Sequence, residues 1–200
     1  MSRRPLTPFP PSARQLGCRS PHKREYVHLA WWTLKSVRRH RGLVAVIVAT
    51  VLLFAYLAAS SGVLHPVLAV LVTVVGLGAY LFLATVVLWV SFAWRKRCVI
   101  YMSLAGDAVI VLQSHKRQLV WEAKNHIAKH IGTRRGEALR ATMKTPLLKA
   151  ASDAGVDIYG KAANGKVQRL YLDQFGTVGL SPTGSKGVTW PKPPRLHPKN

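Results

Sequence analysis

The segment from Gly42 to Trp94 contains no Lys, Arg, Asp or Glu, although basic residues crowd both of its ends. A run of about 20 apolar residues crosses the hydrocarbon core of a bilayer as a helix, so this segment has room for two crossings. Small and helix-breaking residues, Ser60-Ser61-Gly62 and then His65-Pro66, mark a turn near its middle. The alternative, a buried hairpin of a soluble protein, would need a much larger protein around it. We therefore predict a transmembrane helical hairpin over residues 43–94, with helices over Leu43–Ala59 and Val67–Trp94.

The charges on either side of the apolar segment predict its orientation. Ten basic residues and one acidic residue, Glu25, precede it, and Arg95-Lys96-Arg97 follows it directly. Lys and Arg near the ends of membrane spans are retained on the cytoplasmic side. We expect an integral cell-membrane protein with two spans and with both termini in the cytoplasm. Residues 26–42 combine aromatic and basic side chains, which predicts an amphipathic juxtamembrane segment on anionic lipid head groups.

The two ends of the chain have the composition of disordered segments. Residues 1–25 combine five prolines with many Ser and Arg residues, and we interpret them as a disordered basic arm. Residues 181–200 are a Pro/Gly-rich tail, which we expect to add at most one or two short strands before it becomes disordered. The part of the chain that can carry chemistry therefore lies within residues 98–180.

The formal net charge of +22 divides into about +9 before the apolar segment and +13 after it. Charge of this size attracts polyanions such as nucleic acid. Topology already accounts for part of it, because every charged residue lies on the side where cations are favoured. The chain has no RNA-binding aromatic signature, so we regard nucleic acid as a weak partner and anionic lipid as the stronger one.

Short apolar strands alternate with helical stretches in residues 98–180, which predicts a mixed sheet with helices. The third strand has a competing interpretation as a helix over Trp121–His130, and Pro146 should bend or break the first helix. The predicted order is strand Cys98–Ser103, strand Ala108–Gln113, strand Gln118–His130, helix Gly136–Ala154, strand Val156–Tyr159 and helix Asn164–Phe175. The fold class is α/β: a transmembrane hairpin followed by a small mixed α/β domain.

From Trp121 onward the chain resembles the GNAT superfamily of acetyl-CoA-dependent N-acetyltransferases. In that family a central strand ends in a loop of the form Gln/Arg-x-x-Gly-x-Gly/Ala that leads into a helix, and this chain has Thr133-Arg134-Arg135-Gly136-Glu137-Ala138. The family also shows Asn-x-x-Ala-x-x-Leu-Tyr before a Gly-Phe pair. Here the corresponding residues run from Asn164 to Leu170-Tyr171, with Phe175-Gly176 in the opposite order. The resemblance covers about a quarter of the chain and implies a truncated acetyltransferase fold.

This resemblance implies acetyl-CoA as cofactor and an amine as acceptor. Residues 132–138 would hold the pyrophosphate, because a helix N-terminus offers unpaired N–H groups to an anion. The implied pyrophosphate-binding residues are Gly132, Thr133, Arg134, Arg135, Gly136, Glu137 and Ala138. Asn164 would lie near the pantetheine arm, and Tyr171 would be the general acid for the departing thiolate. Glu122 is the carboxylate best placed to deprotonate the amine.

Each of these residues also has a purely structural interpretation. Gly136 can be a helix-start glycine, Tyr171 a core aromatic and Glu122 a surface charge. His126 and His130 are spaced for one helix face, but a catalytic metal needs a third ligand and none stands at a supporting spacing. We therefore predict no metal site.

The chain departs from the family ahead of Trp121. Family members carry a strand and two helices there, which wall the acceptor pocket, whereas this chain has room for one hairpin. The acceptor side is therefore either missing or supplied by the N-terminal arm, the membrane face or a second copy of the chain. Two functions therefore stand side by side: a membrane-anchored N-acetyltransferase, and an inactive membrane protein that serves as a platform for anionic lipid, nucleic acid or a protein partner.

Overall fold

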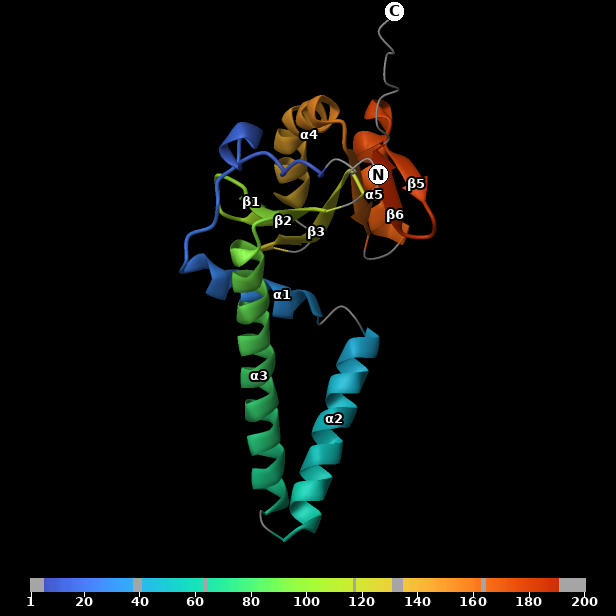
Figure 1. Ribbon diagram of the computed structural model, residues 1–200. Helices are drawn as coiled ribbons and strands as arrows, with labels where there is room; N and C mark the ends of the chain where they lie inside the picture. The colour runs from blue at the N-terminus through green and yellow to red at the C-terminus, as the bar shows by residue number, and fades with distance from the viewer. Residues whose placement is uncertain are drawn as a thin grey trace, which may run out of the picture. The chain divides into compact units, whose positions relative to one another are not determined.

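The computed structural model describes residues 6–37, 41–62, 65–116, 118–130, 135–162 and 165–190 (Figure 1). The chain folds as two units. One unit is helical and contains residues 22–91, and the other combines the chain before His22 with the chain after Ser91. The second unit is mixed α/β, as the sequence predicts, and its strands form one six-stranded sheet.

Three helices make up the first unit, and the last of them ends a few residues inside the second. They are α1 (Glu25–Val37), α2 (Arg41–Ser60) and α3 (Pro66–Trp94). Within the described residues, α3 is the one helix that is long and apolar enough to cross a membrane, over Val67–Trp94, and the apolar part of α2, Val44–Ser60, is shorter. The indole N–H of Trp89 donates a hydrogen bond to the Thr33 hydroxyl at 2.9 Å, which joins α3 to α1.

The sheet has the strand order β1-β2-β3-β4-β6-β5. Its strands are β1 (Cys98–Met102), β2 (Ala108–Ser114), β3 (Val120–Ala128), β4 (Asp157–Lys161), β5 (Ser181–Thr183) and β6 (Gly187–Trp190). Neighbouring strands are antiparallel except β3 and β4, which are parallel. Residues 120–128 are therefore a strand, and the competing helical interpretation is wrong.

Helix α4 (Arg135–Ala154) connects the two parallel strands and lies against one face of the sheet (Figure 1). Leu139 and Met143 of α4 pack with Tyr101, Ile110 and other apolar side chains in the main core. Pro146 lies inside α4, which runs without interruption to Ala154, so the expected break does not occur. We call the side of the sheet that carries α4 the helix face and the other side the open face.

The N-terminal arm is ordered from residue 6, contrary to the expected disorder of residues 1–25. Its 3-10 helix η1 (Arg14–Leu16) contacts α4, and Leu16 and Cys18 are buried in the main core. The Pro8 carbonyl accepts hydrogen bonds from Ser114 Oγ at 2.9 Å and from Trp121 Nε1 at 3.0 Å. Composition misled here, because prolines lack N–H groups but keep their carbonyls, and their fixed φ lowers the entropy lost on ordering.

The last described residues also belong to the domain. Helix α5 (Gly165–Phe175) and the 3-10 helix η2 (Gly176–Val178) lead to β5 and β6, and β6 pairs with β4. The indole N–H of Trp190 donates to the Val178 carbonyl at 2.7 Å. The domain therefore extends beyond the expected boundary at residue 180, with the two short strands that the sequence allows. The rest of the predicted tail, 191–200, lies outside the described residues.

A β-bulge in β3 decides which side chains reach the helix face. Val109 pairs with Ile127 and Val111 with Lys124, so two residues of β3, Asn125 and His126, stand opposite one residue of β2. Asn125 has a φ of 47°, a left-handed conformation that Asn tolerates better than most residues. Because side chains alternate along a strand, the extra residue turns His126 toward the helix face.

Candidate functional site

The predicted phosphate loop is described from Arg135 onward. Gly132, Thr133 and Arg134 lie outside the described residues, and so does Asn164. Arg135, Gly136, Glu137 and Ala138 form the first turn of α4. Arg135 is engaged by the turn between β1 and β2, where its guanidinium lies 2.8 Å from the Asp107 carboxylate. A phosphate would therefore have to share this arginine with Asp107.

Gly136 is buried, and its lack of a side chain has a local cause. A Cβ at this position would lie 2.6 Å from Nε2 of His126. The imidazole thus occupies the space next to the first turn of α4, where any other residue at position 136 would project. The family resemblance assigns this glycine to phosphate approach, whereas the described contacts assign it to His126.

Tyr171 joins a cluster on the helix face that the sequence analysis missed. Its hydroxyl is 3.2 Å from His126 Nδ1, and His126 Nδ1 is in turn 2.9 Å from Nη1 of Arg140. Arg140 also donates from Nε to the Gln174 side chain at 2.7 Å, and its guanidinium stacks 5.0 Å from the centroid of the Tyr171 ring. We call His126, Arg140, Tyr171 and Gln174 the His126 cluster.

Burial sets the electrostatics of the His126 cluster. It lowers the pKa of His126 to about 3, with the nearby Arg140 charge acting in the same direction, so the ring is neutral near pH 7. Burial raises the pKa of Tyr171, while Arg140 opposes that rise. Arg140 is only 8% exposed, and the hydrogen bonds described for it go to neutral groups. The cluster therefore holds one buried positive charge beside a protonated phenol.

Glu122 lies on the open face, on the other side of β3. Its Oε2 is 2.6 Å from Nε2 of His115 and 2.9 Å from Nζ of Lys124. Burial acts to raise the pKa of Glu122, but the hydrogen bonds from Lys124 and His115 outweigh it and hold the pKa below its usual value. The carboxylate is thus ionised near pH 7 and ready to bind a cation, although it is a weak base.

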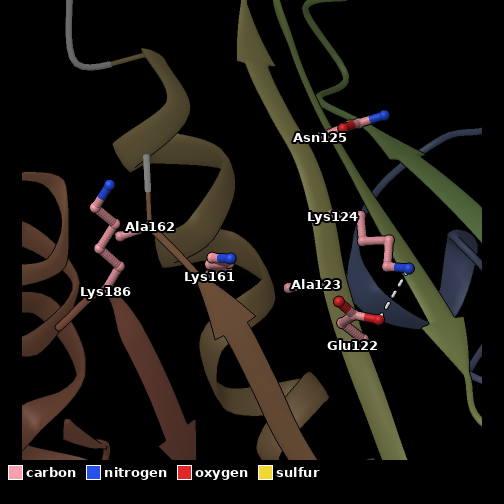
Figure 2. A pocket seen from close by; sticks show the side chains of 7 residues that line it. All are labelled: Glu122, Ala123, Lys124, Asn125, Lys161, Ala162 and Lys186. Carbon is pink, nitrogen blue, oxygen red and sulfur yellow. Dashed lines mark ion pairs between the residues drawn. The ribbon is translucent and has the colours of Figure 1, made fainter. Parts of the chain in front are cut away.

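A groove opens where β3 and β4 separate. The two strands pair in register only from Val120–Asp157 to Ala123–Gly160, and β3 continues to Ala128. Beyond the last pair lies an open groove of about 430 Å³. Figure 2 shows its lining, which consists of Glu122, Ala123, Lys124 and Asn125 from β3, Lys161 and Ala162 at the end of β4, and Lys186 beside β6.

The groove brings Glu122 to the same place as three lysines that the sequence analysis did not select. The sequence alone does not mark Lys161 and Lys186 as site residues, because no local pattern shows that β3 and β4 stop pairing next to them. His126 was noticed only for its spacing from His130. In a strand the two rings do not share a helix face, and within the described residues no group of three or more potential metal ligands occurs.

Comparison with protein families, with curated proteins and with solved structures finds no match to this chain.

Proposed function

We propose that the α/β unit is an acetyltransferase that moves an acetyl group from acetyl-CoA to an amine. The observation that carries this proposal is the groove between the parallel strands β3 and β4, with α4 starting beside it. Tyr171 stands on the helix face of β3 and Glu122 on its open face. An amine would reach a thioester in the gap from the open face. Tyr171 does not line the groove, so its proton would have to reach the thioester from the helix face of β3.

Extended amide-containing ligands bind well along a strand that has lost its partner, since main-chain hydrogen bonds replace the missing pairing. The pantetheine arm of coenzyme A has two amides and could pair with β3 beyond Ala123. Its pyrophosphate would then meet the first turn of α4, where N–H groups and the helix dipole favour an anion. The Arg135 guanidinium would add its positive charge to the positive end of the helix dipole.

In the acetyl transfer, Glu122 would accept one proton and Tyr171 would donate one, so the protons balance. The neutral amine attacks the thioester carbonyl and forms the new C–N bond, and Glu122 takes the amine proton, directly or through water. The C–S bond then breaks, and Tyr171 donates its proton to the leaving thiolate. Solvent returns the proton to Tyr171 and removes the one on Glu122. Because the pKa of Glu122 is depressed, the carboxylate stays in its base form as the pH falls, so protonation of the acceptor amine is expected to limit the rate at low pH.

Calorimetric titration of the detergent-solubilised chain with acetyl-CoA tests this proposal. Ala138→Glu places a negative charge in the exposed first turn of α4, and we expect it to weaken binding about tenfold or more. Ala141→Glu is the matched control, because it adds the same charge at an exposed position one turn further along the helix. Equal effects of the two substitutions, or no binding by the folded chain, would reject the proposal.

We further propose that α2 and α3 together form the membrane anchor, with both termini of the chain in the cytoplasm. The apolar part of α2, Val44–Ser60, has 17 residues, which is at the short end of the range of about 17–25 for a membrane span. Large apolar side chains on both helices are exposed, such as Leu52 and Phe54 on α2 and Leu71 and Val75 on α3. Lipid is the solvent in which such a surface is stable. Retention in the membrane pellet after alkaline carbonate extraction is the expected result.

One observation favours a second candidate function, a membrane-bound platform without catalysis. The Glu122 carboxylate is held by Lys124 and by the His115 ring, and Arg135 already has Asp107 as a counterion. A net charge of +22 would in that case serve to hold anionic lipid, nucleic acid or a protein partner, including a second copy of the chain. Failure of acetyl-CoA to bind the folded chain would leave this function standing.

A further inference from the structure

We propose that the groove between β3 and β4 selects an acceptor in which the amine is accompanied by a phosphate group. This inference rests on the proposed acetyltransferase function and adds the chemical class of its acceptor. Lys161 and Lys186 would bind the phosphate, and Glu122 would bind the amine.

The charge of the groove carries the inference. Three lysines and one glutamate line it, which gives a net charge of about +2 at pH 7. A phosphate monoester carries about −1.5 to −2 at this pH, so its charge matches the lining. A polycationic acceptor would be repelled by the same groove.

The lysines divide into two kinds by their contacts. Lys124 is bound to Glu122 at 2.9 Å, so its charge is already compensated. The side chains of Lys161 and Lys186 form no hydrogen bond or ion pair with any residue that the structure describes, and both residues are exposed. In Figure 2 they stand together on the β4 side of the groove, with Glu122 and Lys124 on the β3 side. The groove therefore has an uncompensated positive end.

Alternation along the strands places the amine end of the groove on the open face. Trp121 and Ile158 are paired and both pack on the helix face. Glu122, one residue beyond Trp121, and Lys161, three residues beyond Ile158, therefore project to the other side. An amine entering from the open face would meet Glu122, which is already held by His115 and Lys124. An incoming ammonium group can exchange with Lys124 at this carboxylate without leaving it unpaired.

Phosphate is a better fit than carboxylate for this positive end. Two lysines supply compact point charges with rotatable donors, a combination that suits the three oxygens of a phosphate. A single carboxylate would leave one of the two lysines uncompensated. An amine beside a phosphate occurs in a free aminophosphate, which is a monoester, and in the head group of an aminophospholipid, which is a diester with one negative charge. The charge of the groove favours the monoester, and experiment distinguishes the two sources.

The test is calorimetric titration of the detergent-solubilised full chain with phosphoethanolamine, which carries both an amine and a phosphate. Ethanolamine lacks the phosphate, and inorganic phosphate lacks the amine. We expect phosphoethanolamine to bind about tenfold or more tightly than either fragment, since a hydrogen bond to a charged group typically contributes this much. Lys161→Ala and Lys186→Ala should each weaken its binding to a similar degree. Lys149→Ala, an exposed lysine on α4, should leave it unchanged.

A second arm identifies the source of the acceptor. Phosphatidylethanolamine in the micelle should displace phosphoethanolamine if the acceptor is a lipid, and phosphatidylcholine, whose nitrogen has no proton to lose, should not. Absence of displacement by either lipid indicates a free aminophosphate.

Two results would overturn the inference while leaving the proposed function intact. In the first, acetyl-CoA binds but phosphoethanolamine binds no better than ethanolamine. In the second, Lys161→Ala and Lys186→Ala weaken acetyl-CoA binding and leave phosphoethanolamine unchanged, which would assign the lysines to the cofactor. If the unmodified chain did not bind acetyl-CoA, the proposed function itself would be rejected.

Discussion

The two faces of β3 handle ionisable side chains in opposite ways. On the helix face, the bulged residue His126 lies in a partly buried cluster with Arg140 and Tyr171, and burial lowers its pKa to about 3. On the open face, Glu122 forms an ion pair with Lys124 and a hydrogen bond with His115, whose side chains are about one-third exposed. Solvent screens the second set of charges and not the first.

The difference in exposure determines which ion pairs and hydrogen bonds can be replaced by contacts with a ligand. Enclosed groups such as Arg140 have no water to replace a lost partner, so their arrangement must stay fixed. Partly exposed groups such as Glu122 can trade one cation for another at little cost in stability. The helix face is thus suited to hold a residue such as Tyr171 in position, and the open face to receive a ligand.

The largest expected effect on stability comes from filling the space beside His126. Gly136→Ala would place a Cβ 2.6 Å from the imidazole, which is pinned by Tyr171 and Arg140 and cannot move without losing them. We expect a loss of about 1–3 kcal/mol in the free energy of unfolding, as overpacking usually costs. Urea denaturation followed by tryptophan fluorescence measures it.

Gly165→Ala is the control for this substitution, because nothing lies within 4 Å of a Cβ at that position. It starts helix α5, where alanine is a better helix former than glycine, and should be neutral or slightly stabilising. If Gly136→Ala were equally harmless, the His126 cluster would not be as rigid as its contacts indicate.

A change of pH is expected to have an intermediate effect on the free energy of unfolding. In the unfolded chain His126 takes up a proton near pH 6.5, whereas in the folded chain it does so only near pH 3. Unfolding therefore binds a proton between these values, and stability should fall with decreasing pH by up to about 1.4 kcal/mol per pH unit. His126→Gln keeps a hydrogen-bonding side chain and removes this titration. Thermal unfolding between pH 7 and 5 should show a clearly shallower slope for the variant, and parallel slopes would contradict the assignment.

The smallest effect on the free energy of unfolding is expected from a substitution on the open face. Glu122→Gln removes the charge that pairs with Lys124 and His115, and partly exposed pairs of this kind contribute about 0–1 kcal/mol. We expect a change of this size in the free energy of unfolding at low salt, and less at high salt because the charges are then screened. A loss of several kcal/mol would mean that the open face is as rigid as the helix face.

The positions of the strands and helices could be predicted from the sequence better than the side-chain contacts of the candidate site residues. Runs of β-branched residues located β1 and β2, and apolar spacing located α4, because these patterns report local burial. His126 could not be placed from its position, since simple alternation from Trp121 would put it on the open face. Only the bulge at Asn125, which depends on pairing with β2, turns it to the helix face.

The same limit applies to the groove and to the N-terminal arm. Lys161 and Lys186 approach Glu122 through the separation of β3 and β4, which is a property of the sheet and not of any local pattern. The arm was expected to be disordered from its prolines. Its order comes from partners such as Trp121, 113 residues further along the chain.

The hydrogen bonds of the Pro8 carbonyl have a consequence for synthesis of the chain. Its partners Ser114 and Trp121 lie 106 and 113 residues away, beyond both apolar helices. At about 5–20 residues per second, the ribosome needs roughly 5 to 20 s to make this intervening length. During that interval the arm has been translated but the side chains that will hold it have not. The α/β unit can therefore close only after α2 and α3 have been made, so the proposed membrane anchor is synthesised before the domain can fold.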